Sequence, residues 1–138
     1  EGYMTPHGEL FDIGITTSSA LNNIKRGAKP SMSGLKNEMS AGNGSLMRCI
    51  PYAFVEDFHK SVFNMLMDNK ITHRHHLCSL SCMYYAKMMR SILDGKDKKE
   101  LCSIADGYIR SGWRITDADD DHKETQKIFL ILKKRHIW

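Results

Sequence analysis

The side chains best suited to chemistry lie in one short segment, Met39-Ser40-Ala41-Gly42-Asn43-Gly44-Ser45-Leu46-Met47-Arg48, shortly before Pro51. Two glycines flank an asparagine there, and glycine lets a ligand approach bare backbone. The apolar residues that follow suit a short helix that Ser45 would cap, with unpaired N–H groups at its start. Such groups attract phosphate and other anions, and Arg48 adds a positive charge. We therefore predict an anion-binding loop; the alternative is a tight turn that only reverses the chain.

Two further segments lie on either side of this loop. The first is Phe11-Asp12-Ile13-Gly14-Ile15-Thr16-Thr17, and the second is Ile71-Thr72-His73, at the expected start of a long helix. In this order and spacing, the three segments resemble the ADP-ribosylglycohydrolase family, of the dinitrogenase-reductase-activating glycohydrolase type. The resemblance covers residues 3–110, which correspond to the central portion of the family's domain.

This resemblance implies an all-α fold, a multi-helix orthogonal bundle, with residues 1–138 forming a single helical domain that is an incomplete part of the family's larger domain. It implies a hydrolase that cleaves the bond between ADP-ribose and a modified acceptor side chain. ADP-ribose or an ADP-ribosylated substrate is therefore the expected partner. Because water attacks an anomeric carbon, such a site must hold a diphosphate and stabilise positive charge on the ribose.

The resemblance also assigns substrate-binding residues. Those that match the family segment lying against the ribose and diphosphate are Gly42, Asn43, Gly44 and Ser45. We expect backbone N–H groups of Gly44 and Ser45, with the Ser45 hydroxyl, to bind phosphate oxygens. His73 matches the family's Thr-His pair, whose imidazole lies beside the substrate. Thr72 is expected to cap the helix that follows.

Two charged residues near these positions each have two interpretations. Asp12 matches a family aspartate that acts near the ribose as a base or electrostatic stabiliser; the alternative is a helix N-terminal cap. Ile15 stands where the family often has asparagine, so one polar contact to the ribose is lost. Arg48 either contacts phosphate or braces its own loop from behind, and we favour the brace.

The resemblance further implies two magnesium ions bound mainly by carboxylates. The family's first carboxylate motif, Thr-Asp-Asp-Thr, is absent from this sequence, and the second, Asp-x-Asp-Thr or Asp-x-Asp-Ser, has one partial match at Asp117 and Asp119. We interpret that match as an acidic loop capping the last helix, with a cation site as the alternative. The magnesium ligands are therefore expected mostly outside this chain. His73, His75 and His76 do not suit zinc, because on a helix they point in different directions.

Without its metal ligands, the chain alone is expected to be a poor catalyst. Since it begins at Glu1 and not at methionine, we interpret it as a fragment of a hydrolase. The alternative is a non-catalytic ADP-ribose-binding module or an inactive paralogue, and a third hypothesis is a helical interaction domain. An incomplete helical domain would expose core surface, which predicts self-association or a partner chain.

Composition limits the other classes. A length of 138 residues suits one domain. The net charge of +4 is spread along the chain, so we expect no nucleic-acid partner. No apolar run reaches the ~18 residues of a membrane span. The four cysteines, without a visible signal peptide, indicate buried reduced thiols in a cytoplasmic protein.

The elements that must position these residues are all predicted to be helices. Apolar residues at helical spacing predict helices over residues 16–26, 52–67, 73–94, 97–108 and 123–135, with a short one after Ser45. Residues 27–44 hold several Gly, Ser and Asn and predict a long functional loop. The long helices should bury Phe54, Phe58, Val62, Met65 and Leu66; Leu77, Leu80, Tyr84, Met88 and Ile92; and Leu101, Ile104, Ala105 and Tyr108.

Overall fold

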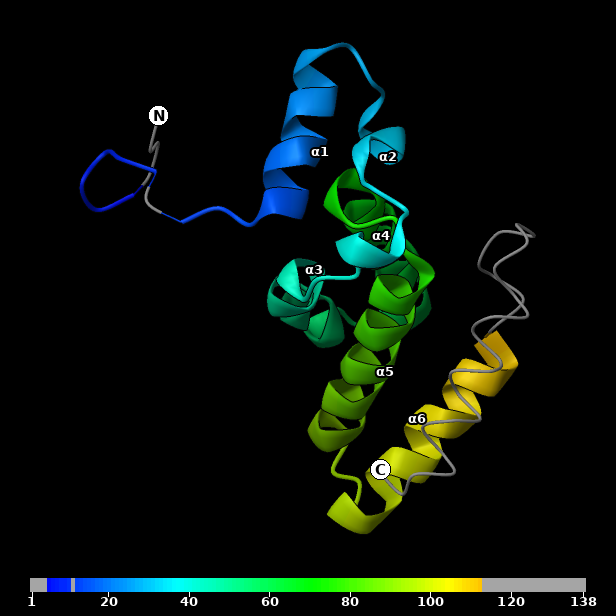
Figure 1. The fold of residues 1–138 in the computed structure, drawn as a ribbon. Helices are drawn as coiled ribbons and strands as arrows, with labels where there is room; N and C mark the ends of the chain where they lie inside the picture. The colour runs from blue at the N-terminus through cyan, green and yellow to red at the C-terminus, as the bar shows by residue number, and fades with distance from the viewer. Residues whose placement is uncertain (1–4, 11, 113–138) are drawn as a thin grey trace.

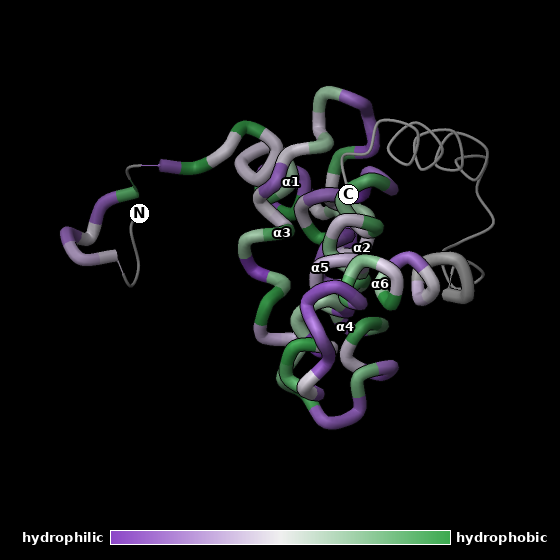
Figure 2. Tube along the Cα trace, turned by 90° about the horizontal axis from the view of Figure 1, so that it is seen from below, coloured by the Kyte–Doolittle hydropathy of each residue, from purple (hydrophilic) through white to green (hydrophobic). Residues whose placement is uncertain are grey.

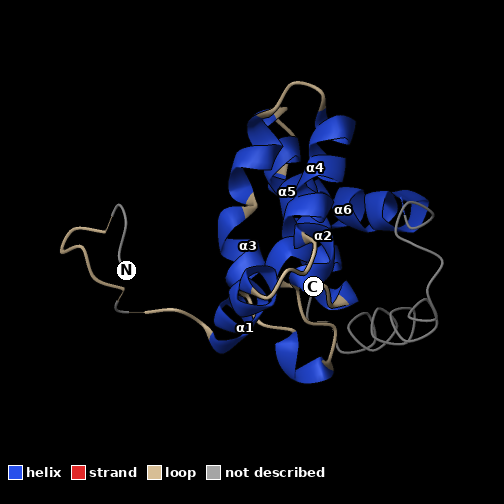
Figure 3. Ribbon diagram, turned by 90° about the horizontal axis from the view of Figure 1, so that it is seen from above, coloured by secondary structure: helices blue, strands red, loops and turns tan. Residues whose placement is uncertain are grey.

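Every regular element in the described part of the chain is a helix. The structure is a computed structural model that describes residues 5–10 and 12–112. Its elements, in order, are α1 (Ile15–Lys25), α2 (Pro30–Ser33), the 3-10 helix η1 (Glu38–Ser40), α3 (Gly44–Arg48), the 3-10 helix η2 (Ile50–Phe54), α4 (Phe58–Thr72), α5 (His76–Leu93) and α6 (Lys98–Gly112). Within residues 5–10 and 12–112 no strand occurs, and the all-α prediction is confirmed (Figures 1 and 3). The predicted helix over residues 123–135 lies outside the described residues.

The core forms where α4 and α5 meet α3 and η2. Asp57 caps α4 by accepting a hydrogen bond from the Lys60 N–H at 3.1 Å. The buried face of α4 consists of the predicted residues Phe58, Val62, Met65 and Leu66. Phe54, predicted to belong to the same face, is 60% exposed because η2 ends there and α4 begins only at Phe58.

The buried face of α5 differs from the prediction. Its most deeply buried apolar residues are Cys78, Cys82, Met83 and Ala86, whereas Ile92 is exposed. This face lies against α3 and α4, and Leu80 and Tyr84 of the predicted stripe pack against the same core but are only partly buried.

The chain turns after α5 and α6 packs back along it (Figure 1). Gly95 adopts a positive φ of 74°, which ends α5 as predicted. Asp97 then caps α6, accepting a hydrogen bond from the Lys99 N–H at 2.8 Å. Leu101 and Ala105 are buried, as their spacing predicts.

The boundaries around two predicted site segments differ from the prediction. Thr72 is the last residue of α4 and does not cap α5; His75 does so, accepting from the Leu77 N–H at 3.3 Å. The helix α1 begins at Ile15 after Gly14, without a side-chain cap. Thr72 cannot cap α5 because α4 continues through it, so α5 begins at His76 and not at the predicted His73.

The predicted long loop contains two short helical turns that tie α1 to the end of α4. The Asn23 Nδ2 of α1 donates to the Ser33 carbonyl at 2.9 Å, and the Ser33 hydroxyl donates to the Ile71 carbonyl at 2.6 Å. The Gly34 N–H donates to the Lys70 carbonyl at 3.1 Å. The last carbonyls of α4, which have no partner inside their own helix, are therefore paired by this segment.

Hydrophilic and hydrophobic residues alternate along the described helices (Figure 2). Among residues 5–10 and 12–112, no helix combines the length and apolar character needed to cross a membrane.

The contact between Gly34 and α4 gives a first prediction, on stability. A Cβ at Gly34 would lie 2.6 Å from the Lys70 carbonyl oxygen and 2.9 Å from the Thr72 carbonyl carbon, and neither backbone group can turn aside. We expect Gly34→Ala to lower the free energy of unfolding by about 1–3 kcal/mol, measured by urea denaturation.

Gly107→Ala is the matched control. Gly107 lies inside α6 with no atom near an added Cβ, so alanine should raise the free energy of unfolding by about 0.5–1 kcal/mol. If both substitutions changed stability with the same sign, the close approach at Gly34 would not be what matters there.

Candidate functional site

The structure places His73 directly against the glycine-rich loop. A Cβ built on Gly44 would lie 2.9 Å from His73 Cε1 and 3.2 Å from Nε2, and one on Gly42 would lie 3.6 Å from Nε2. The imidazole edge therefore faces the backbone of both glycines. Two segments that are about thirty residues apart in the sequence, and that were predicted separately, meet in space.

The end of α4 holds this imidazole in place. His73 follows the helix, its N–H donates to the Asn69 carbonyl at 2.7 Å, and its Nδ1 lies 2.8 Å from Thr72 Oγ1 in a hydrogen bond. The next residue, Arg74, donates its N–H to the Leu35 carbonyl at 3.0 Å. With bonds on both sides, the backbone leaves the ring little freedom to move away from the loop.

His73 is only 2% exposed. Burial lowers the pKa of its imidazole below the usual value, and the positive charge of Arg48 acts in the same direction. The ring is therefore neutral at neutral pH and carries one donor and one acceptor nitrogen. Such a ring can hydrogen-bond a hydroxyl group without placing a charge in the site.

The loop also contacts α5. Ser45 is buried, and the Cys82 thiol donates to its Oγ at 3.7 Å. The Cys78 thiol contacts the Gly42 carbonyl at 3.5 Å. The prediction that Ser45 caps the short helix is wrong, because α3 begins at Gly44 and Ser45 lies within its first turn, facing α5.

Arg48 braces the loop against α4. Its Nε donates to Asp68 Oδ2 at 2.9 Å and its Nη2 donates to the Asp68 carbonyl at 3.0 Å. Both side chains are about one-third exposed, so the pair fixes geometry more than it adds stability. Of the two interpretations of Arg48, these hydrogen bonds favour the structural brace over a phosphate contact. The acceptor is Asp68 of α4, however, and not a carbonyl of the loop.

A buried polar cluster lies beneath the loop. The hydrogen bond with Cys82, followed by burial, raises the pKa of Cys49 far above its usual value. The hydrogen bond with Cys49 lowers the pKa of Cys82. Burial raises this pKa, and the neighbouring Ser45 and Asn69 side chains lower it further. Asn69 is fully buried, and neither of its amide atoms has a partner in hydrogen-bonding geometry among the described residues. The underside of the loop is therefore polar as well as buried.

Asp12 is not brought into this arrangement. It is exposed on the segment before α1, and within the described residues no hydrogen bond or ion pair joins it to the loop or to His73. Its alternative role, capping α1, is contradicted, because the N-cap residue of that helix is Gly14 and no side chain caps it.

The predicted metal candidates, Asp117 and Asp119, lie outside the described residues. In the part of the chain that is described, no group of three or more His, Cys, Asp or Glu side chains could hold a metal ion. The described residues therefore do not fit a magnesium centre by themselves.

Sequence reasoning missed three neighbours of the loop. Thr17 Oγ1 would lie 3.7 Å from a Cβ on Gly44, and this threonine was not assigned to the site from the sequence. Cys78 and Cys82 contact the loop, whereas they were interpreted only as buried thiols. Their spacing of four residues places them on one helix face, and that was the available signal.

Comparison with known proteins agrees with the sequence resemblance. Residues 2–133 match the family described as ADP-ribosylglycohydrolase. The chain belongs to this family. Searches of the curated proteins and of the solved structures gave no match. The family match extends beyond residues 3–110, over which the loop, the aspartate segment and the Thr-His pair resemble the family.

Burial of His73 predicts a pH dependence of stability. In the unfolded chain its pKa returns to about 6.5, while in the fold it is lower, so the unfolded state binds more protons in acid. The contribution to stability is complete above the unfolded pKa and is lost as the pH falls through the folded pKa. We expect the free energy of unfolding to drop between about pH 7.5 and about pH 5, and to drop less in His73→Gln.

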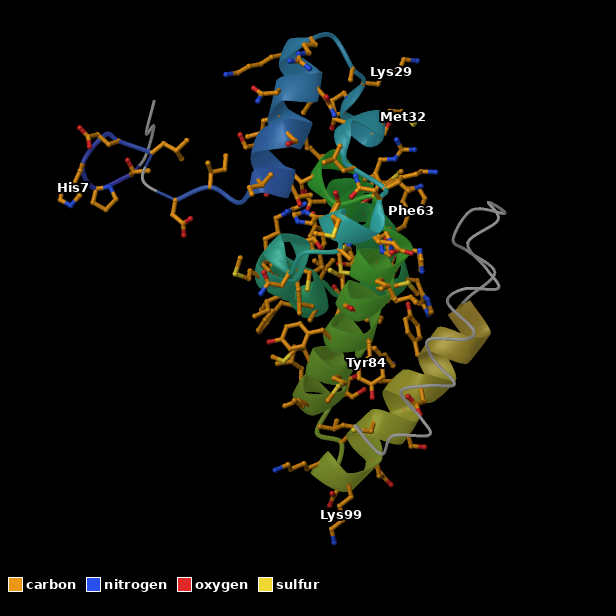
Figure 4. The ribbon with its side chains drawn as sticks, in the orientation of Figure 1. His7, Lys29, Met32, Phe63, Tyr84 and Lys99 are labelled. Carbon is orange, nitrogen blue, oxygen red and sulfur yellow. The ribbon has the colours of Figure 1, made fainter. Side chains whose placement is uncertain are left out.

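His7→Gln is the control, because His7 lies on the N-terminal segment, exposed and apart from the helices (Figure 4). Urea denaturation at the two pH values gives each difference. An equal loss in wild type and His73→Gln would show that His73 does not carry the effect.

Proposed function

We propose that this chain takes part in hydrolysis of the bond between ADP-ribose and a modified acceptor side chain. The observation that carries the proposal is the packing of the His73 imidazole against Gly42 and Gly44. It joins the two sequence segments that the family resemblance assigns to the substrate, in a chain that belongs to the ADP-ribosylglycohydrolase family. Within that family, we propose the dinitrogenase-reductase-activating type.

The loop would bind the diphosphate and ribose through its backbone. Gly42 and Asn43 are exposed and Gly44 is half-buried, so backbone N–H groups at Gly44 and Ser45 are the proposed phosphate donors. The Ser45 hydroxyl is buried against Cys82, and it could reach a ligand only if the loop moved. We therefore assign the contact at Ser45 to its N–H.

His73 would orient the ribose. As a neutral ring it can donate or accept a hydrogen bond at Nε2, the nitrogen that faces the glycines. Its place against the loop suits a role in positioning. Holding the anomeric carbon in the orientation for attack lowers the activation barrier of hydrolysis.

Asp12 is the proposed catalytic residue, as a base for the attacking water or as a stabiliser of positive charge on the ribose. Its exposure on the segment before α1 means that ligand binding would have to bring this segment to the loop. Magnesium is implied by the family alone. Since the described residues do not fit it, we derive no step through a metal ion.

One observation favours a second function, a non-catalytic ADP-ribose-binding module or inactive paralogue. The described residues supply a loop with a neutral histidine beneath it, but they do not bring a carboxylate to it. A ligand cradle without an adjacent carboxylate suits binding better than hydrolysis.

Calorimetric titration of ADP-ribose into the chain tests binding. We expect binding by wild type, and an affinity about tenfold lower for Gly44→Ala, since the new Cβ would displace the imidazole. Gly107→Ala is the control, because Gly107 lies in α6, outside the loop, with no atom near an added Cβ. Absence of binding by wild type, or equal effects of the two substitutions, would contradict the proposed loop.

Repeating the titration with magnesium separates two origins of the affinity. Binding without the ion would support the loop as the ligand cradle. Binding that requires the ion would favour Asp117 and Asp119 as metal ligands.

Asp12→Asn separates the two functions. We expect it to abolish release of ADP-ribose from a modified acceptor, measured by chromatography, without changing the free energy of unfolding, because Asp12 is exposed and makes no described hydrogen bond or ion pair. Glu9→Gln, an exposed change on the same segment, should leave release unchanged. Unchanged turnover in Asp12→Asn would exclude the catalytic role of this aspartate.

A further inference from the structure

Two thiols of α5 contact the glycine-rich loop at both of its ends. Cys78 and Cys82 are four residues apart, so they lie on the same face of the helix, and both are buried. The Cys78 thiol contacts the carbonyls of Ser40 at 4.0 Å and Gly42 at 3.5 Å. The Cys82 thiol contacts the Ser45 hydroxyl at 3.7 Å. Hydrogen bonds from α5 therefore hold the loop at Ser40 and Gly42 on one side of Asn43 and at Ser45 on the other.

These thiols and His73 confine the loop together. The imidazole packs against Gly42 and Gly44, while α5 binds the backbone before Asn43 and the side chain after it. The exposed part that remains is the Gly42–Asn43 turn, where a ligand would approach. A loop held in this way does not need to be ordered by its ligand, which reduces the entropic cost of binding.

The contact at Ser45 persists in either protonation state of Cys82. As a thiol, Cys82 donates to the Ser45 oxygen; as a thiolate, it accepts from the Ser45 hydroxyl. A smaller apolar side chain at position 82 would remove this partner from a hydroxyl that is only 1% exposed. A buried hydroxyl that loses one of its partners costs free energy, so the loop would be held less firmly in this position.

The other two cysteines provide a contrast. The Cys49 thiol bonds the Leu46 carbonyl of its own helix at 3.1 Å. Cys102 lies on α6 and is only half-buried. Neither thiol contacts the loop segment between Ser40 and Ser45 in the described structure.

We propose that Cys78 and Cys82 are positioning residues that hold the loop 40–45 in its ligand-binding conformation. This inference rests on the proposed function, in which that loop binds ADP-ribose. The two cysteines act through the loop and do not touch the ligand themselves.

Hydrogen exchange of the loop amides, measured on the whole chain without ligand, tests the positioning. We expect Cys82→Ala to speed exchange of the residue 42–46 amides about tenfold relative to those of α4. Cys82→Ser keeps a hydrogen-bonding group and should exchange more slowly than Cys82→Ala. Cys78→Ala should loosen the same amides from the other end.

Val62→Ala is the matched control for lost packing. Val62 is buried in the same core, on α4, and its side chain offers no hydrogen bond to the loop. At a similar loss of unfolding free energy, it should leave the ratio of loop to α4 exchange unchanged. If Val62→Ala and Cys82→Ala gave the same ratio, or if Cys82→Ser behaved as Cys82→Ala, the positioning role would be overturned.

Calorimetry with ADP-ribose gives the functional measurement. We expect Cys82→Ala to raise Kd about three- to tenfold while Val62→Ala leaves it unchanged. A loosened loop with unchanged Kd would overturn the link between position and binding. If wild type did not bind, the proposed function would fail, whereas the exchange ratios would still decide whether the thiols hold the loop.

Discussion

The position of the candidate site depends on the close approach of the Ser33–Leu35 backbone to the end of α4. Gly34 donates its N–H to the Lys70 carbonyl, and the Ser33 hydroxyl donates to that of Ile71. Backbone carbonyls at a helix end are costly to bury unpaired, so α4 can end at this place only if the Ser33–Leu35 segment pairs its last carbonyls. His73 and Arg74 follow directly, and Arg74 bonds Leu35. The direction of the His73 side chain is therefore set by a contact between segments far apart in the sequence.

The glycine-rich loop lies between that histidine and α5. Each glycine faces His73, and the thiols of α5 contact the carbonyl of Gly42 and the hydroxyl of Ser45. Buried polar groups in such a place hold one conformation, because leaving any of them unpaired costs free energy. The same burial keeps the imidazole neutral. A loop of small residues thereby acquires a fixed shape.

This geometry favours recognition of a ligand more directly than its cleavage. The chain belongs to the ADP-ribosylglycohydrolase family, and its glycine-rich loop and His73 meet in space. Asp12, by contrast, lies on the exposed segment before α1, and Asp117 and Asp119 lie outside the described residues. The residues proposed for binding and for catalysis therefore lie in different parts of the chain, which is why a titration and a turnover assay answer separate questions.

Some of this could be predicted from the sequence because it is local. Helical spacing identified Phe58, Val62, Met65 and Leu66 as core, and the helix predicted over residues 73–94 does end next to Gly95. Helix boundaries and burial were decided by tertiary contacts. Thr72 ends α4 because Gly34 and Leu35 pair the backbone there, and Cys82 and Ala86, not Ile92, face the core. The sequence by itself determined which residues are candidates for the chemistry. Only the tertiary structure decided that His73 and the thiols of α5 enclose the loop, since that depends on which helices meet.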